Sequence, residues 1–239
     1  MKDQYFGDIN DYRKYGLLRC LTEASGLPLG VYWMRTADDG RSDGGFRKYL
    51  DQPDRWRHFD PDLYDQLCRL LRPGVSRSLQ HVEDWGLIPG AGYYHRLLTD
   101  SADERNDHFD VGLRLFEGFP VIFFDPDNGM EVQSVPYGRR NSGKYLYWRE
   151  IEEAFHCGHS LVIYQHFPRE KREAFIERTA LGLLSRTGAA GVDSFRTANV
   201  VFFLVAQPAH RPAFHTAHDM IVSRWGEQIV PATHVDSNE

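Results

Sequence analysis

The feature that most constrains the fold is the alternation of short apolar runs with segments of helical periodicity. The apolar runs have the length of buried strands, and they lie at 29–36, 119–125, 159–167 and 198–208. In the other segments apolar residues recur every three or four positions, at 8–24, 60–72, 104–118, 145–158 and 168–188. This order predicts an α/β fold in which a mainly parallel sheet carries helices on both faces.

Two further assignments concern shorter segments. The run at 198–208 and the apolar residues of 217–225 together predict an antiparallel strand pair at the C-terminal end. Residues 77–83 are interpreted as an additional short strand. Because neither an internal repeat nor a linker-like stretch interrupts the alternation, residues 1–239 are predicted to form a single α/β domain.

The composition excludes several classes of protein. With 41% hydrophobic and 26% charged residues, the chain is ordinary for a globular protein and unlike disordered or fibrous ones. The apolar runs fall well short of the roughly 20 residues that span a bilayer, and the polar N-terminus lacks the apolar core of a secretory signal. The 3 cysteines lie far apart, which favours free thiols over disulfides or a zinc site. We therefore expect a cytoplasmic protein with no membrane partner.

The charge of the chain limits its partners. A formal net charge of -6 gives no general attraction to phosphate. A nucleic-acid partner, RNA or DNA, would have to bind a local basic face, for which residues 41–50 and 168–173 are candidates. Such short basic runs are more often solvated surface, and the sequence leaves the oligomeric state open.

Polar side chains follow three of the predicted strands. In an open parallel sheet, ligands bind beyond the carboxyl ends of the strands, where loops and helix N-termini converge. We therefore expect these polar side chains to share one edge of the sheet: Asp38, Asp39 and Asp43; Asp125, Asp127, Asn128 and Glu131; and Gln165 and His166.

The segment Asp-Pro-Asp-Asn-Gly-Met-Glu at 125–131 is the strongest candidate for a functional site. A tight turn explains Asp-Pro or Asn-Gly but does not need two further acids. Like charges so close raise one another's pKa, and that cost suggests a cation or a polar substrate group between them. Asp125 is the residue of this segment that we least expect to be structural.

Several segments resemble a bacterial family of large-subunit ribosomal RNA adenine-N6 methyltransferases. Residues 5–21 are similar to that family's first helix, with Gly7, Asp8, Asp11, Lys14 and Tyr15 at matching positions. The strand and Asp125-Pro126 resemble its strand and Asp-Pro-Pro-Tyr motif, while the segments 87–98 and 159–169 are similar to two more of its segments. The Asp-Pro-Asp-Asn-Gly form also resembles a group of uncharacterised bacterial proteins.

This resemblance implies a Rossmann-like, methyltransferase-type sheet with an antiparallel C-terminal strand. It also implies transfer of a methyl group from S-adenosylmethionine to an exocyclic amine of a nucleic-acid base, which Asp125 and the Pro126 carbonyl would orient. The chain departs from the family motif at Asp127, where proline is expected, and at Asn128, which replaces the aromatic residue that stacks on the base. The aromatic residues that could replace it are Tyr145, Tyr147 and Trp148.

The resemblance also implies a cofactor site. A glycine-rich loop should follow the first strand, and an acid near residues 83–84 should hold the ribose hydroxyls of the cofactor. Lys14 and Arg13 lie on the first helix, where each can bind a carboxylate or a phosphate. The candidate cofactor-binding residues are Asp38, Asp39, Gly40, Gly44, Glu83 and Lys14.

Two other functions fit the same acids. Asp125, Asp127 and Glu131 are oxygen ligands suited to Mg²⁺ or Mn²⁺, as in a metal-dependent nuclease or hydrolase, with His166 as a candidate base. In that pattern Gln133 stands where a lysine is expected. Alternatively, the chain is a methyltransferase-like scaffold that binds a partner without catalysis. The histidine pairs His156/His159 and His215/His218 are interpreted as surface residues.

Overall fold

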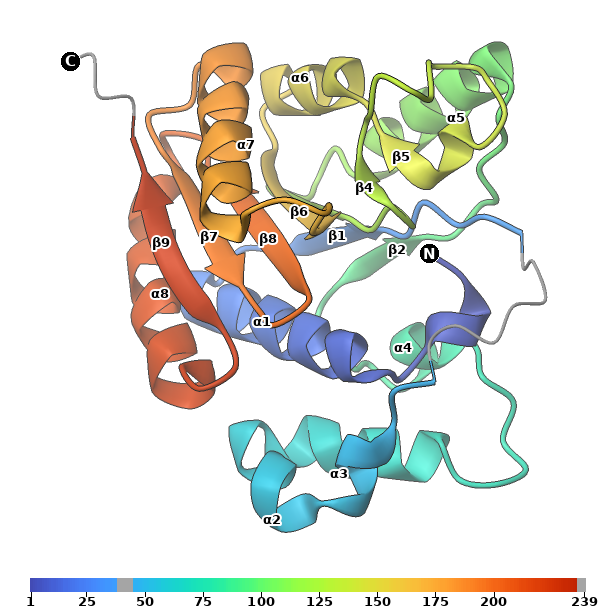
Figure 1. The fold of residues 1–239 in the computed structure, drawn as a ribbon, viewed down its shortest axis with the longest axis vertical. Helices are drawn as coiled ribbons and strands as arrows, with labels where there is room; N and C mark the ends of the chain where they lie inside the picture. The colour runs from blue at the N-terminus through green and yellow to red at the C-terminus, as the bar shows by residue number, and fades with distance from the viewer. Residues whose placement is uncertain (38–44, 236–239) are drawn as a thin grey trace.

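The computed structural model describes residues 1–37 and 45–235, which contain a central seven-stranded sheet between two layers of helices (Figure 1). The order across the sheet is β2-β1-β3-β6-β8-β7-β9. The strands are β1 (Leu29–Tyr32), β2 (Gly92–Tyr94), β3 (Val121–Phe124), β6 (Ser160–His166), β7 (Val192–Arg196), β8 (Val200–Val205) and β9 (Val230–His234). A small parallel pair joins β4 (Gly129–Met130) to β5 (Tyr145–Leu146).

The sheet is mainly parallel, as predicted. The pairs β1 with β2, β1 with β3, and β3 with β6 are parallel. Strand β8 is antiparallel to both of its neighbours, β6 and β7, and β9 is antiparallel to β7 at the sheet edge. Only β8 and β9 among the strands of the described ranges therefore run against the others. The mainly parallel sheet between layers of helices confirms the expected Rossmann-like α/β class, and the C-terminal strand β9 is antiparallel as expected.

Each face of the sheet has its own apolar core, because successive strand residues point to opposite faces. In β8, Val200, Phe202 and Leu204 belong to one core, whereas Val201, Phe203 and Val205 belong to the other. The first core is covered by α1 (Ile9–Ser25), α3 (Pro61–Leu70), α4 (Gln80–Asp84) and α8 (Arg211–Trp225). The second is covered by α5 (Ala102–Leu115), α6 (Trp148–His156) and α7 (Arg172–Thr187).

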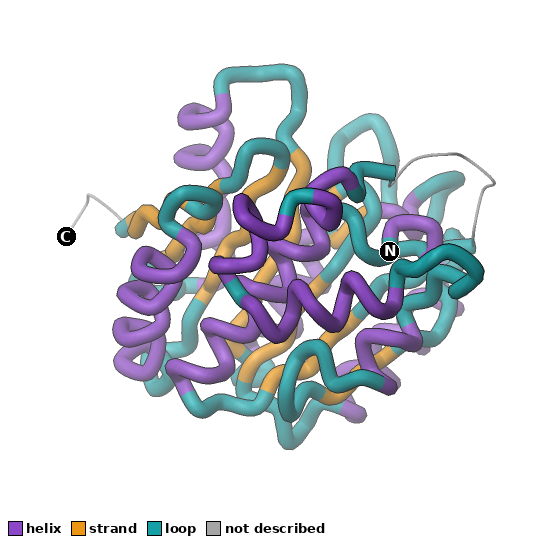
Figure 2. The backbone as a smooth tube through the Cα atoms, turned by 90° about the horizontal axis from the view of Figure 1, so that it is seen from below, coloured by secondary structure: helices purple, strands orange, loops and turns teal. Residues whose placement is uncertain are grey.

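The face that carries α1 is shown in Figure 2, where helices lie in front of the strands. Helix α1 begins at the cap residue Asp8, whose side chain accepts from the backbone N–H groups of Asn10 and Asp11 at 2.8 and 3.0 Å. It ends at Gly26, which adopts the left-handed conformation (φ 66°) that glycine tolerates best. This helix leads from the carboxyl edge of the sheet to the start of β1, so its first turn lies where a ligand would bind.

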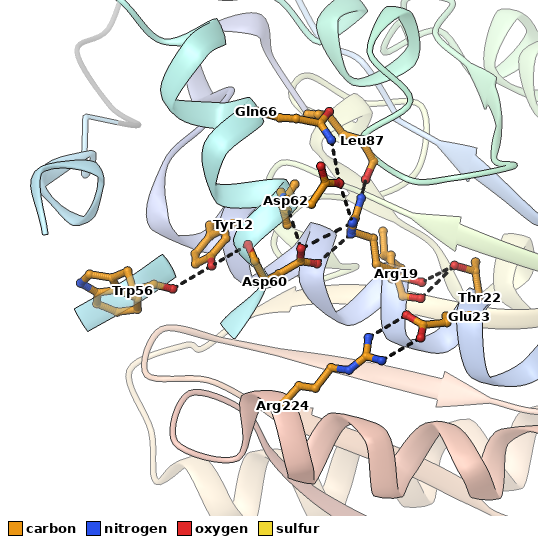
Figure 3. Close-up of polar contacts among 12 residues, drawn as sticks. Tyr12, Arg19, Thr22, Glu23, Trp56, Asp60, Asp62, Gln66, Leu87 and Arg224 are labelled. Carbon is orange, nitrogen blue, oxygen red and sulfur yellow. Dashed lines mark hydrogen bonds and ion pairs between the residues drawn. The ribbon is translucent and has the colours of Figure 1, made fainter. Parts of the chain in front are cut away.

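A helical insert separates β1 from β2 and packs on α1. It comprises η2 (Lys48–Asp51), α2 (Pro53–Trp56), η3 (Arg57–Phe59), α3 and α4. Figure 3 shows its anchors: Arg19 of α1 binds Asp60 at 2.7 Å and Asp62 at 3.0 Å, and Tyr12 donates to the Trp56 carbonyl at 2.9 Å. Asp60 also caps α3 by accepting from Leu63 N–H at 3.0 Å. The insert is thus held by both polar and apolar contacts.

Two local expectations are wrong. Residues 217–225 form part of α8 instead of a strand, because Phe214, Ala217, Ile221 and Trp225 recur at helical spacing and all face the core. Residues 77–83 lead into α4, and the strand in this region is β2. The edge strand β9 is mostly exposed and so carries little apolar signal. None of the helices in the described ranges is long and apolar enough to cross a membrane.

Candidate functional site

A cavity of about 440 Å³ lies beyond the carboxyl ends of β3 and β6, against the start of α1. This is the edge where an open parallel sheet binds its ligands. We call it the acid pocket, and its lining residues are Met1, Tyr5, Asp8, Asn10, Asp11, Lys14, Phe46, Asp125, Pro126, Asp127, Asn128, Tyr164 and His166. The predicted residues Asp125, Pro126, Asp127, Asn128, Lys14 and His166 are therefore brought together.

The segment 125–128 continues directly from β3. The Asp125 backbone N–H donates to the Tyr32 carbonyl at 3.1 Å, which extends the parallel ladder with β1 by one residue. Asp125 and Pro126 are buried, whereas Asn128 is exposed at the pocket margin. At Gly129 (φ 99°) the chain turns away, and a Cβ there would lie 2.4 Å from Oε1 of Gln165. Gln165 also accepts from Met130 N–H at 2.6 Å, so this predicted polar residue fixes the turn instead of lining the pocket.

Lys14 is the central cation of the pocket. Its Nζ donates to Asp11 Oδ1 and to Asp125 Oδ2, both at 2.8 Å, and only 2% of its side chain is exposed. Burial alone would lower the pKa of Lys14, but the two carboxylates outweigh burial and raise it. The ammonium group is therefore charged, and it fixes the orientation of the Asp125 carboxylate.

Asp127 is also paired. Its Oδ1 lies 2.7 Å from the α-amine of Met1, and its Oδ2 accepts from the Thr36 hydroxyl at 2.5 Å. The same amine donates to the carbonyls of Met34 at 3.0 Å and Asp125 at 3.2 Å. Asp127 therefore ties the end of β3 to the segment after β1.

The environments of the two carboxylates push their pKa values apart. Burial raises the pKa of Asp125, although Lys14 and the amine of Met1 oppose it. Burial also acts on Asp127, but there the amine and the Thr36 hydroxyl prevail and lower the pKa. Such a split between neighbouring acids is frequent at functional sites.

Asp8 and Asp11 add two more acids at the start of α1. Asp8 is buried, and this burial together with the charge of Asp11 raises its pKa to about 6. Asp11 accepts from Gly7 N–H at 2.9 Å and from the Tyr15 hydroxyl at 3.1 Å besides binding Lys14. The sequence analysis identified these two residues only through their match to the family segment, since acid at a helix start is expected in any case.

Aromatic rings complete the wall, but they are not the predicted ones. The Lys14 ammonium lies 5.0 Å from the ring centre of the buried Tyr164, and Tyr5 and Phe46 line the same cavity. Tyr164 directly precedes Gln165 at the end of β6. This position at a strand end is the signal from which the sequence could have predicted it as a pocket residue. The predicted substitutes lie outside the pocket lining: the Tyr147 hydroxyl donates to Val135 at 2.8 Å, and Trp148 starts α6.

His166 closes one side of the pocket. Surrounding protein atoms desolvate its ring and the nearby Lys14 charge adds to this effect, so its pKa falls to about 4 although part of the residue is exposed. The imidazole is therefore neutral near pH 7 and can accept or donate one hydrogen bond.

Only some of the predicted cofactor-binding residues lie in the part of the chain that the structure describes. Asp38, Asp39, Gly40, Asp43 and Gly44 lie outside the described residues. Glu83 does not line the acid pocket: it is exposed on α4, and its Oε2 lies 3.8 Å from Nδ1 of His95. Arg13 faces away from the Lys14 cluster and donates to Gln228 at 2.7 Å. Lys14 alone of the candidates in the described ranges lines the pocket.

The predicted metal triad does not assemble. Glu131 accepts from Trp148 N–H at 2.8 Å at the start of α6, whereas Asp125 and Asp127 bind Lys14 and Met1. Residues 1–37 and 45–235 contain no group of three or more His, Cys, Asp or Glu side chains that could hold a metal ion. The reason is the turn at Gly129, which directs Glu131 to α6.

Comparison with known proteins leaves the family open. No family model matches the chain, and no curated protein matches its sequence. Among solved structures, the crystal structure of protein LPL1258 from Legionella pneumophila strain Philadelphia 1, given the family designation DUF519, is similar to this chain with a TM-score of 0.46. The two share 12% identity over 98% of this chain and 99% of that one. A likeness at this level identifies neither family nor function.

Proposed function

We propose that the chain is a methyltransferase-like enzyme that transfers a methyl group from S-adenosylmethionine to an exocyclic amine of a nucleic-acid base. One observation carries the proposal: the segment Asp125 to Asn128 lines a cavity at the carboxyl edge of a sheet in which an antiparallel strand stands between β6 and β7. The resemblance implies a mainly parallel sheet of this class with an antiparallel C-terminal strand, and the cavity lies at the edge where such sheets bind ligands.

The pocket residues suit the task of holding an amine. Lys14 binds one oxygen of Asp125 and thereby orients the carboxylate. An exocyclic amine that donates to Asp125 and to the Pro126 carbonyl would keep its nitrogen lone pair free on the opposite side. Catalysis of this kind depends on positioning more than on proton transfer. Neutral His166 borders the same space and can accept a further hydrogen bond.

The donor set of the pocket also fits the cofactor. When bound, S-adenosylmethionine supplies an electrophilic methyl group on a sulfonium ion. This sulfonium and the cofactor's ammonium group are cations, and the pocket offers the carboxylates of Asp8, Asp11, Asp125 and Asp127 together with the Tyr164 ring. A volume of about 440 Å³ lies within the usual range for small-molecule sites.

Calorimetric titration of S-adenosylmethionine tests the proposal. We expect saturable binding to the wild-type chain, weakened by about 10-fold or more (about 1.4 kcal/mol) in Asp125→Asn. The control is Asp193→Asn, which removes a partly buried carboxylate that lies 3.7 Å from Arg211 and outside the acid pocket. This control should bind the cofactor like the wild type. Absence of binding by the wild-type chain, or equal binding by all three proteins, would contradict the proposal.

A second function, binding without catalysis, is favoured by a different observation. Asp125 and Asp127 already have cationic partners within the chain, Lys14 and the amine of Met1. Internal pairing of this kind is also what a purely structural acid cluster would show. Incubation with labelled S-adenosylmethionine and mixed RNA and DNA oligonucleotides separates the two functions, because only the enzyme would transfer the label, and only with Asp125 intact.

A further inference from the structure

A second, larger cavity lies beside the acid pocket, on the helical insert. It measures about 800 Å³, and the basic residues along it are Arg47, Lys48, Arg72 and Arg77. Among the described residues that line it, Asp51 is the single acid. These four cations line one cavity although the chain as a whole has a net charge of -6. We call it the basic groove.

The basic groove and the acid pocket share a border. Phe46 lines the pocket, while its neighbours Gly45 and Arg47 line the groove. The segment before α1 joins them a second time: Arg77 donates to the Phe6 carbonyl at 2.9 Å, between the pocket residues Tyr5 and Asp8. A ligand long enough to follow the groove therefore reaches the mouth of the pocket.

The border between the two cavities exposes an aromatic ring. The side chain of Phe46 is 72% exposed, a large fraction for a phenylalanine. Exposed aromatic rings next to a positively charged groove are the usual means by which proteins hold single-stranded nucleic acid, since bases stack on the ring while cations follow the backbone.

The groove has a rigid base. The Tyr64 hydroxyl donates to the carbonyls of Tyr49 and Leu50 at 3.1 and 2.7 Å, and the Tyr49 hydroxyl donates to the Gly7 carbonyl at 3.1 Å. These bonds hold the short helix η2, which carries Lys48, against the segment that enters the pocket. The backbone that carries Lys48 is thus held against the segment before α1, whose residues Tyr5 and Asp8 line the acid pocket.

We infer that the basic groove binds the phosphodiester backbone of a single-stranded nucleic acid, with Phe46 stacking on a base next to the one that enters the acid pocket. This inference rests on the proposed function and names the form of the substrate. Arg47, Lys48 and Arg72 are exposed and can each reach a phosphate, whereas Arg77 is partly buried and supports the groove wall. A base presented from a single strand needs no extrusion from a duplex.

Fluorescence anisotropy with a labelled single-stranded RNA of about 12 nucleotides, near the upper end of common site sizes, tests the inference. The charge reversal Lys48→Glu/Arg72→Glu should weaken binding about 10-fold or more, and the dependence of log K on log salt should fall by about 1.4 if two contacts of about 0.7 each are lost. Phe46→Ala should weaken binding without changing the salt dependence.

The matched control is Arg114→Glu/Arg140→Glu, which changes the net charge equally at two exposed sites, one on α5 and one in the loop between β4 and β5. Helix α5 lies across the sheet from the insert (Figure 1). This control should bind within about 2-fold of the wild type at about 0.1 M salt, where charges farther apart than about 10 Å are screened. Thermal unfolding of each variant verifies that it is folded.

Two results would overturn the inference: no oligonucleotide binding by the wild-type chain, or equal losses in the groove variant and the control. The proposed function fails separately, in the cofactor titration of the wild-type chain. If that titration shows no binding while the groove variant still loses RNA affinity, the groove remains a nucleic-acid site on a protein that does not transfer methyl groups.

Discussion

At the scale of single residues, Asp8 shows that the acid pocket contains a carboxylate whose burial is unfavourable. It caps α1 through two backbone N–H groups, a role in which asparagine serves equally well. Its carboxylate is nevertheless buried beside Asp11, and its pKa is raised to about 6. Near pH 7 the chain therefore holds a charge that its surroundings disfavour, a cost that a cationic ligand in the pocket would offset.

This cost should be visible as a pH dependence of stability. A carboxyl whose pKa is higher in the folded than in the unfolded state stabilises the fold while protonated, and this contribution is lost as the pH rises from about 4 to about 6. Asp8→Asn should therefore be more stable than the wild type by about 2–3 kcal/mol at pH 7.5, with the difference vanishing near pH 4. Urea unfolding at both pH values measures it, and equal differences at the two values would show that burial of the charge is not the cause.

At the scale of elements, the packing of α1 on α8 determines how closely the first helix approaches its neighbour. Gly16 lies in the middle of α1, where glycine disfavours a helix by about 1 kcal/mol relative to alanine. A Cβ at this position would lie 2.1 Å from Cζ2 of the buried Trp225. The glycine is therefore required by the close approach of the indole and not by its backbone conformation.

Gly16→Ala should destabilise the protein despite the gain in helix propensity. Overpacking against a rigid indole costs about 1–3 kcal/mol, and chemical denaturation should show a loss in that range. Gly118→Ala is the control, because nothing lies within 4 Å of its added Cβ and its φ is not left-handed. That variant should be neutral or more stable by up to about 1 kcal/mol. Similar stabilities of the two variants would mean that Trp225 moves aside.

At the scale of the whole molecule, one buried ion pair joins the first helix to the middle of the sheet. Lys14 and Asp125 are 111 positions apart, and both side chains are almost completely buried. Lys14 also separates Asp125 from Asp11, so the loss of this cation would leave two buried carboxylates uncompensated. The pair couples the folding of α1 to the formation of the acid pocket.

Lys14→Met should therefore lower the free energy of unfolding by about 3–5 kcal/mol, as expected when one partner of a buried pair is removed. Arg57→Met, which breaks the exposed pair with Asp65 at 2.8 Å, should have a much smaller effect. The double variant Lys14→Met/Asp125→Asn should recover part of the loss. Denaturant unfolding of the wild type, Lys14→Met, Asp125→Asn and the double variant gives the coupling energy, and a coupling near zero would show that the pair contributes nothing as a unit.

Much of the fold could be predicted because β3 and β8 are entirely apolar, β6 contains the apolar run 161–164, and the caps Asp8 and Asp60 mark two helix starts. The prediction failed where local and tertiary signals differ. At 217–225 adjacent apolar residues suggested a strand, but packing against α1 selects the helix. Strands β2 and β9 are short or exposed, so they depend on neighbours already in place.

The sequence by itself determined the class of fold and the segment 125–128 as the edge of a site, because hydrophobic periodicity and strand-end position are local properties of the chain. Only the tertiary structure decided which groups meet that segment. In the folded chain Lys14 binds Asp125, the Tyr164 ring lies beside Lys14, and Glu131 accepts a hydrogen bond at the start of α6. These contacts join residues distant in sequence, and their distances depend on how helices pack across the sheet, which no local pattern encodes.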